Sequence, residues 1–223
     1  MSYKALALLV TILTIGVGLG GQRLKLDNAK QPRYGFLIGP GCSSLDERHK
    51  DAGNWNIFPG YLVGGFVRKP LTSWLDAQAE IQFVSRRAYR IFDHPQPYVF
   101  DMKVDIDNKL LRLPVSLIIA QPLDHGIITA YMGAGLSLGT PLQVTMTKEL
   151  RYQNQSVSTT QNILDQYPIP MTGYQALLGI KISPTFSELR FGCDFNSFNA
   201  PGLGLNELKQ WEIWWLFGLT HKD

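Results

Sequence analysis

The chain has 223 residues and a formal net charge of +3, which is too small to indicate a nucleic-acid partner. Its two cysteines, Cys42 and Cys193, lack the Cys-x-x-Cys spacing of zinc sites, so we predict no metal ion. Beyond the N-terminus the chain has no long apolar run that would form a membrane helix, and its length suits one domain.

The N-terminus has the three parts of a secretory signal peptide. Lys4 precedes an apolar run over residues 5–15, and small residues follow at positions 16–21. This order predicts a signal peptide over residues 1–21 and an exported domain over residues 22–223. A membrane anchor helix is the alternative, although the apolar stretch is short and ends in glycines.

Alternating side chains predict eight β-strands in the exported domain, because a period of two residues is that of a strand. The predicted strands are residues 34–41, 60–68, 73–87, 109–120, 126–138, 173–182, 188–195 and 209–220. No long amphipathic helical stretch is evident, so we predict an all-β fold.

The apolar faces of these strands are large and rich in aromatic residues, above all on the last strand, where Trp214 and Leu216 interrupt the polar face. Such strands fit a wall with lipid on one side and a polar interior on the other. The residues expected to face lipid are Leu75, Ile81, Phe83, Leu113, Val115, Phe191, Trp211, Ile213, Trp215 and Phe217. A soluble barrel or sandwich would instead bury these faces, and periodicity alone leaves that alternative open.

The connections between the predicted strands alternate in length. Residues 69–72, 121–125 and 183–187 form short, proline-containing turns. The other connections are long, namely residues 42–59, 88–108, 139–172 and 196–208. Short turns at one end and long loops at the other predict an eight-stranded antiparallel up-and-down transmembrane β-barrel of the bacterial outer membrane. Within residues 139–172 we expect both surface loop and continuation of the adjoining strands.

The polar faces would line the lumen of this barrel and carry both signs of charge. The expected lumen charges are Asp76, Glu80, Arg112, Lys181, Arg190, Asp194 and Glu212. Charges in a narrow interior must be paired, so we expect Arg112 to pair with Asp76 or Glu80. We expect Lys181 and Arg190 to pair with Asp194 or Glu212. A salt-bridged structural lumen is favoured over a gated pore or ligand site.

No set of residues predicts catalysis or a bound cofactor. His49, His94 and His125 fall in connections, and His221 lies near the C-terminus. Asp93 and His94 could form a hydrolytic pair at the outer rim, but no third residue completes a triad. We therefore predict a protein that is not an enzyme.

Several short motifs resemble the PorT-like outer-membrane β-barrel proteins common in Bacteroidetes. They are residues 35–39, residues 60–66, the Leu-x-Leu-Pro strand at Leu111–Pro114, and the Tyr-x-x-x-Gly strand at Tyr131–Gly135. A mature start at Gln22 also fits this group. The resemblance implies barrel architecture and an outer-membrane location, and it brings no catalytic residues. For a barrel of this kind we expect outer-membrane lipid, the barrel-assembly machinery and envelope proteins as partners.

Three functions follow from these observations. The first is a small outer-membrane barrel with a structural, envelope-assembly or secretion-associated role. The second is a secreted soluble barrel that binds an apolar ligand inside. The third is a barrel hydrolase acting at the outer rim. The direction in which Trp211, Ile213, Trp215 and Phe217 point discriminates the first from the second, because only a membrane barrel turns them outward.

Overall fold

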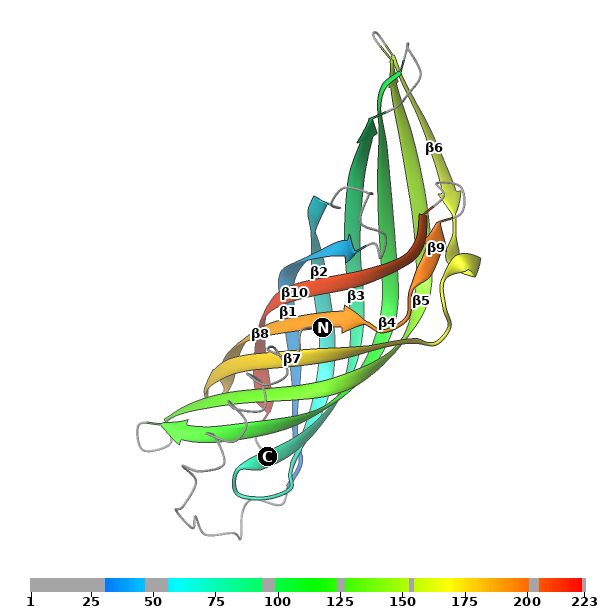
Figure 1. The fold of residues 1–223 in the computed structure, drawn as a ribbon. Coiled ribbons are helices and arrows are strands. Elements are labelled where there is room, and N and C mark those ends of the chain that lie inside the picture. Colours follow the sequence, from blue (N-terminus) through cyan, green and yellow to red (C-terminus); the bar gives the residue numbers. More distant parts are fainter. Residues whose placement is uncertain are drawn as a thin grey trace, which may run out of the picture.

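The computed structural model describes residues 31–46, 56–93, 99–123, 127–152, 155–200 and 205–221, so the predicted signal peptide lies outside the described residues. Antiparallel strands dominate these residues (Figure 1). The elements are β1 (Arg33–Asp46), β2 (Asn56–Pro70), β3 (Leu75–Asp93), β4 (Val99–Leu123), β5 (Ile128–Tyr152), β6 (Ser156–Asn162), the 3-10 helix η3 (Leu164–Gln166), β7 (Met171–Ile182), β8 (Thr185–Asp194), β9 (Phe198–Ala200) and β10 (Leu205–His221). Within the described ranges, no helix has the length and apolar character needed to cross a membrane.

The sheet closes into a ring, because β1 pairs with β2 on one edge and with β10 on the other. Tyr34, for example, lies opposite Val67 in β2 and opposite His221 in β10. The ring has eight strands in the order β1-β2-β3-β4-β5-β7-β8-β10, and each pair is antiparallel. Strand β6 pairs with β5 outside this ring, and β9 pairs with β10. The predicted eight-stranded up-and-down barrel is confirmed.

Each predicted strand overlaps one strand of the ring, and the short turns join the pairs that the sequence predicts. Between β2 and β3, the backbone N–H groups of Leu71 and Thr72 donate to the carbonyl oxygen of Leu75 at 2.8 and 3.0 Å. Between β7 and β8, only Ser183 and Pro184 intervene. Strand β1 begins and β10 ends at this same end of the ring.

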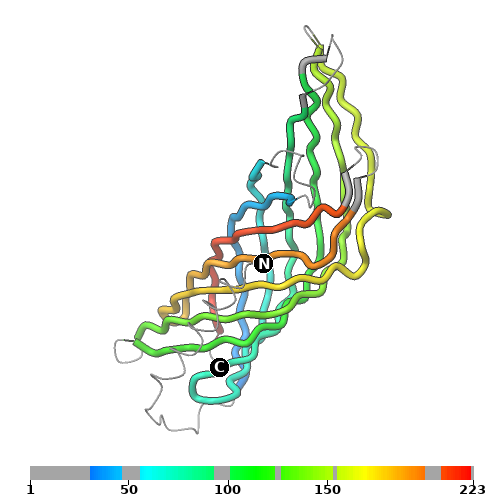
Figure 2. The backbone as a smooth tube through the Cα atoms, in the orientation of Figure 1, coloured from blue at the N-terminus to red at the C-terminus, as the bar shows by residue number. Residues whose placement is uncertain are grey.

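The long connections contain much more strand than the sequence predicts. Residues 88–108 were expected to form a loop, but β3 and β4 stay paired from Ala88↔Ile106 to Asp93↔Asp101. Strand β5 continues to Tyr152, and β6 returns alongside it. These parts form a projecting sheet, which we define as residues 88–93, 99–109, 143–152 and β6. Figure 2 shows that it extends well beyond the ring.

The expected continuation of strand within residues 139–172 is present in β5 and β6. The β3–β4 part of the projecting sheet was not predicted, because the polarity of its strands is reversed. In the part of β4 that follows Lys109 and belongs to the ring, the outward residues are Leu111, Leu113, Val115 and Leu117, and all are exposed. In the part of β4 that precedes Lys109 and belongs to the projecting sheet, the inward residues Val104 and Ile106 are buried. They alternate with outward charged residues that include Asp105 and Asp107. The register of β4 with β5 also shifts between Lys109 and Leu110. Both changes place the edge of the apolar band near Lys109.

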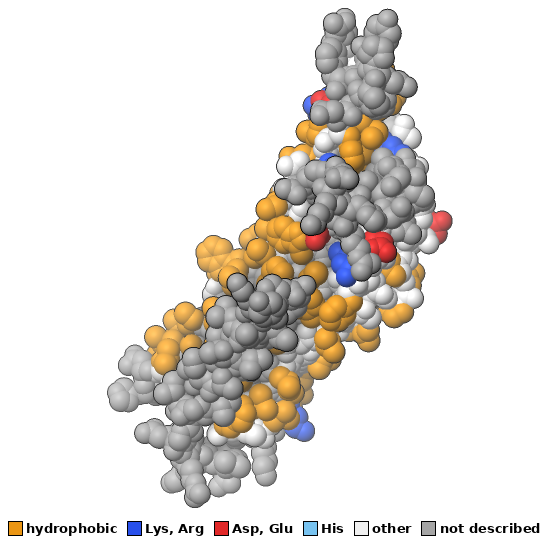
Figure 3. Space-filling view, viewed as in Figure 1, with side chains coloured by type: hydrophobic (Ala, Val, Ile, Leu, Met, Phe, Trp, Pro, Cys, Tyr) orange, Lys and Arg blue, Asp and Glu red, His pale blue; other side chains and the backbone are white. Residues whose placement is uncertain are grey.

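The apolar band has the height of a thin membrane core. From Leu111 to Ile119 a strand rises by about 26 Å along its own direction, and by about 20 Å along the barrel axis at a tilt near 40°. Outer-membrane barrels carry an apolar band roughly 25 Å tall. Hydrophobic side chains accordingly cover much of the barrel wall that is visible in Figure 3.

An apolar cap covers the end of the ring from which the sheet projects. It is the buried cluster Leu45, Ala88, Val104, Ile106, Val144, Met146, Ile163, Tyr167, Met171, Phe198 and Leu208. The ring of Tyr167 stacks on that of Phe198, with centroids 4.1 Å apart. Burial raises the pKa of the Tyr167 hydroxyl, so this group stays neutral. The cap therefore joins the inner face of the projecting sheet to β9, β10 and the segment around η3.

Candidate functional site

The interior of the ring is packed with polar side chains, because every second residue of each strand points inward. The buried polar and charged residues of the ring include Arg68, Asp76, Gln78, Glu80, Gln82, Arg86, Arg112, Ser116, Gln175, Glu188, Arg190, Asp194, Gln210 and Glu212. A barrel of eight strands is just wide enough for side chains to fill it. How these groups pair decides whether the interior is a passage or a core.

A first charge cluster lies nearer the cap and consists of Arg86, Arg112, Asp194 and Glu212. Arg86 donates from Nη2 to Oδ2 of Asp194 at 2.7 Å and from Nη1 to Oε2 of Glu212 at 3.2 Å. Arg112 donates from Nη2 to Oε2 of Glu212 at 3.0 Å, and its Nη1 also bonds to Oε1. Glu212 is thus held between two arginines.

A second charge cluster is centred on Arg190. Its Nη1 donates to Oε2 of Glu80 at 2.7 Å, and its Nε bonds to Glu188. Two amides extend this cluster, because Gln78 and Gln82 donate to the two oxygens of Glu80 at 2.8 and 2.7 Å.

Arg68 completes the second cluster at the end nearer the short turns. Its Nε donates to Oε1 of Gln78 at 2.5 Å, and its guanidinium lies 4.8 Å from the ring centroid of Tyr131. Arginine stacked on an aromatic face gains a cation–π attraction that lysine would supply less well.

Each cluster is electrically balanced. The first has Arg86 and Arg112 against Asp194 and Glu212, and the second has Arg68 and Arg190 against the pair of glutamates. Balance matters here because an unpaired ion in a poorly hydrated interior costs several kcal/mol.

The ion pairs cross the full width of the barrel. Strands β3 and β8 are four places apart in a ring of eight, as are β4 and β10, so each of these pairs lies on opposite walls. Arg86 and Glu80 of β3 reach Asp194 and Arg190 of β8, and Arg112 of β4 reaches Glu212 of β10. These pairs brace the ring and obstruct its interior.

Apolar side chains fill the space around the charge clusters. The buried cluster inside the ring is Leu37, Leu62, Phe66, Val84, Leu110, Phe186, Trp214 and Leu216. Trp214 and Leu216, which interrupt the polar face of the last predicted strand, therefore point inward. The lumen is a mixed core of ion pairs and apolar side chains.

The structure places the expected lumen charges inside, although their partners differ from those expected. Asp76, Glu80, Arg112, Arg190, Asp194 and Glu212 are buried, and Lys181 is half-buried. Arg112 pairs with Glu212 and not with Asp76 or Glu80, while Arg190 pairs with Glu80 and Glu188. The expected pairing assumed neighbouring strands, but long arginine side chains reach across so narrow a ring.

Sequence reasoning missed three lumen charges, namely Arg68, Arg86 and Glu188. All three were visible from the strand period. Arg86 stands four residues after Gln82 in a strand whose even positions face inward, and Glu188 stands two residues before Arg190. Arg86 is the most consequential of the three, because it is fully buried and pairs with both carboxylates of the first cluster.

Asp76 and Lys181 lie at the mouth of the barrel, on the side of the short turns. They line a small pocket of about 190 Å³ together with Arg33, Arg68 and Tyr131. Arg68 lines this pocket and also belongs to the second charge cluster, so the cluster forms the inner end of the pocket.

The residues expected to face lipid lie on the outer wall. Ile81, Leu113, Val115, Phe191, Ile213, Trp215 and Phe217 are exposed, while Leu75, Phe83 and Trp211 are partly exposed. A soluble barrel with an apolar ligand inside would turn these side chains inward. Their outward direction selects the membrane barrel from these two alternatives.

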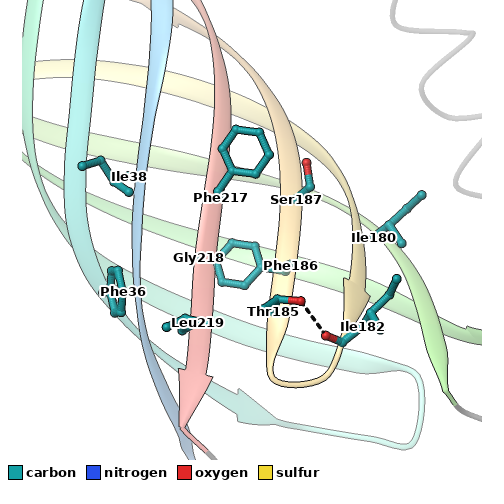
Figure 4. A pocket seen from close by; sticks show the side chains of 10 residues that line it. All are labelled: Phe36, Ile38, Ile180, Ile182, Thr185, Phe186, Ser187, Phe217, Gly218 and Leu219. Carbon is teal, nitrogen blue, oxygen red and sulfur yellow. Dashed lines mark hydrogen bonds between the residues drawn. The ribbon is translucent and has the colours of Figure 1, made fainter.

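One shallow apolar groove of about 560 Å³ interrupts the outer wall (Figure 4). Small Thr185 and Ser187 form its floor between larger side chains such as Ile180 and Phe217. Both hydroxyls are engaged within the wall, because Thr185 donates to the carbonyl of Ile182 at 2.8 Å and Ser187 accepts from Nε1 of Trp215 at 2.9 Å. The groove therefore offers mainly apolar contacts to the membrane.

Among the described residues, no three histidine, cysteine, aspartate or glutamate side chains are placed to hold a metal ion. Cys42 and Cys193 are free thiols. His94, the proposed partner of Asp93, lies outside the described residues.

Comparison with known proteins finds similarity in fold at low identity. No family model and no curated protein matches the chain. Ail, the attachment invasion locus protein of Yersinia pestis, is 12% identical over 86% of this chain and 99% of that one, with a TM-score of 0.40. Neisserial surface protein A is 10% identical over 83% and 96%, with a TM-score of 0.42. The outer membrane protein OprG from Pseudomonas aeruginosa is 11% identical over 89% and 100%, with a TM-score of 0.43. Identities and TM-scores this low do not indicate the role of this protein.

The closed ring, the apolar outer wall and the charged interior define a membrane-spanning β-barrel. A closed barrel leaves no backbone group unpaired at an edge within the ring, which is what a lipid environment requires. Small barrels with this polarity are integral proteins of the bacterial outer membrane. Membership of the PorT-like family stays a prediction.

The lipid-facing wall should not tolerate charge. We expect Ile81→Arg and Val115→Arg each to lower the free energy of unfolding by about 2–4 kcal/mol, because both side chains lie within the apolar band. The measurement is urea unfolding in lipid vesicles. Thr145→Arg is the matched control, since Thr145 pairs with Asp107 beyond the band, and it should cost little. Equal effects at all three positions would contradict the assigned band.

Proposed function

We propose that this protein is a small outer-membrane barrel with a structural role in the cell envelope, that it is not an enzyme, and that its lumen does not conduct ions. The observation that carries this proposal is the set of ion pairs across the full width of the ring. A solute would have to break pairs in both charge clusters to pass. Such a lumen serves the rigidity of the barrel and not transport.

The proposed orientation puts the short turns in the periplasm and the projecting sheet outside the cell. Charged pairs on the outer face of that sheet support this placement, since Arg87 meets Asp105 at 2.7 Å and Arg151 meets Glu149 at 3.2 Å. They suit water and not lipid. The partners of the proposed role are outer-membrane lipid, the barrel-assembly machinery and envelope proteins.

Fractionation and conductance test the proposal together. The protein should stay in the outer-membrane pellet through high salt and alkaline washing, and recovery as a soluble periplasmic monomer would contradict the location. Purified protein in planar bilayers should show no steady conductance, because the pairs across the ring obstruct the lumen. A conductance that changes in Arg112→Met without loss of stability would favour a pore. Lipid or peptide hydrolysis that depends on His94 would overturn the non-enzymatic role.

A further inference from the structure

Strand β6 has one paired edge and one open edge. It pairs with β5 from Thr145↔Asn162 to Arg151↔Ser156, and no other described strand pairs with it. All seven of its residues are exposed. In Figure 1, β6 is the strand at one edge of the projecting sheet, next to β5.

Two hydrogen bonds show which backbone groups of β6 reach the open edge. At its ends, Tyr152 N–H donates to the carbonyl of Gln155 at 2.8 Å, and Ile163 N–H donates to the carbonyl of Val144 at 3.0 Å. Because the direction alternates along an antiparallel strand, odd-numbered residues bond to β5 and even-numbered ones point away. Ser156, Ser158, Thr160 and Asn162 therefore present their N–H and C=O groups to the open edge.

The side chains agree with this assignment. In antiparallel pairs the residues that do not exchange backbone bonds bring their side chains closest together. Thr147 and Thr160 are such a pair, and their hydroxyl oxygens lie 2.9 Å apart.

The open edge of β6 lacks the usual protection against strand pairing. Natural edge strands carry lysine or other charges, proline or bulges, which prevent addition of another strand. The sequence of β6 is Ser-Val-Ser-Thr-Thr-Gln-Asn, with no charge and no proline. Its register with β5 is continuous, without a bulge. An uncharged edge of seven residues without a bulge is a template for a further strand.

We propose that β6 is a docking edge that takes an extended peptide segment of another envelope or extracellular protein by strand addition. Backbone pairing would supply the affinity, and alternate side chains the selectivity. Exposed Val157 favours an aliphatic neighbour on one face, while the row of Ser158 and Thr160 favours hydroxyl or amide side chains on the other. The location of this partner rests on the proposed outward orientation of the projecting sheet.

A second copy of this chain fits the edge less well. Two β6 strands that pair antiparallel are related by a twofold axis perpendicular to the strands. This axis turns the second molecule upside down relative to the first. Because β6 runs along a sheet that projects from the ring, the second barrel would then point away from the shared membrane. A separate peptide has no such restriction.

Peptide binding to detergent-solubilised protein tests the open edge. The probe is a fluorescent peptide with the sequence of residues 145–151, a strand that pairs with β6 in this molecule. Ser158→Pro removes an N–H at the open edge and leaves the bonds to β5 intact, so it should weaken binding about tenfold. Ser158→Ala keeps the N–H and should change binding by less than about twofold.

Hydrogen exchange gives a second reading of the same edge. The amides of Ser158 and Thr160 should exchange rapidly in the free protein and slowly with the probe bound, whereas the amide of Thr159 should be protected throughout. Absence of peptide binding, equal binding by both Ser158 variants, or a protected Ser158 amide in the free monomer would overturn the proposal. Self-association that Ser158→Pro abolishes would assign the edge to a second copy and overturn it as well. These measurements in detergent are independent of the cellular location.

Discussion

Replacing Arg86 with methionine should lower the free energy of unfolding by about 3–5 kcal/mol, because it leaves the buried carboxylate of Asp194 without compensation. Arg86 is fully buried and pairs with Asp194 at 2.7 Å and Glu212 at 3.2 Å. Without it, Glu212 keeps Arg112, but Asp194 loses its arginine in the interior of the ring. Methionine is similar in length, so the loss reports the charge more than the packing.

Urea unfolding in lipid vesicles measures this effect, and the adjacent residue provides the control. Arg87 points outward and pairs with Asp105 at the surface of the projecting sheet, so Arg87→Met should cost about 0–1 kcal/mol. Adding Asp194→Asn to Arg86→Met should recover part of the loss, because the two positions interact directly. A loss at Arg86 no larger than that at Arg87 would mean that water compensates the lumen charges and that the interior is not a dry core.

The contrast between Arg86 and Arg87 also shows what the sequence can predict. The strand period alone places neighbouring arginines on opposite sides of the wall, and the same rule places Ile81 and Val115 outward. The closed ring followed from counting such segments and from the alternating lengths of their connections. These features depend on each strand separately, so they can be read locally.

The pairing partners inside the ring could not be read in the same way. Whether Arg112 meets Glu80 or Glu212 depends on how far neighbouring strands are staggered and on the width of the closed ring. Neither quantity is encoded in one strand. The β3–β4 part of the projecting sheet escaped prediction for a related reason, since Val104 and Ile106 face inward there and reverse the polarity expected of a membrane strand.

Trp214 shows the limit of the two-residue pattern most clearly. Its position has the inward phase, although a large indole is unexpected in a polar lumen. The ring makes room for it with glycine, because a Cβ at Gly60 would lie 3.2 Å from Cη2 of Trp214, and one at Gly41 would collide with the indole. The fit depends on three strands at once, and it is visible only when β1, β2 and β10 are assembled.

Trp214→Ala should therefore lower the free energy of unfolding by about 3–5 kcal/mol, since it leaves a cavity beside glycines that have no side chains to fill it. The neighbouring Trp215→Ala is the matched control, because Trp215 is 57% exposed on the outer wall. It loses apolar contact and its hydrogen bond to Ser187, but acyl chains can occupy the space, so no cavity remains. Urea unfolding in vesicles should show the larger loss for Trp214→Ala. The reverse order would mean that the lumen around Trp214 is hydrated, and it would reopen the pore as the function of this barrel.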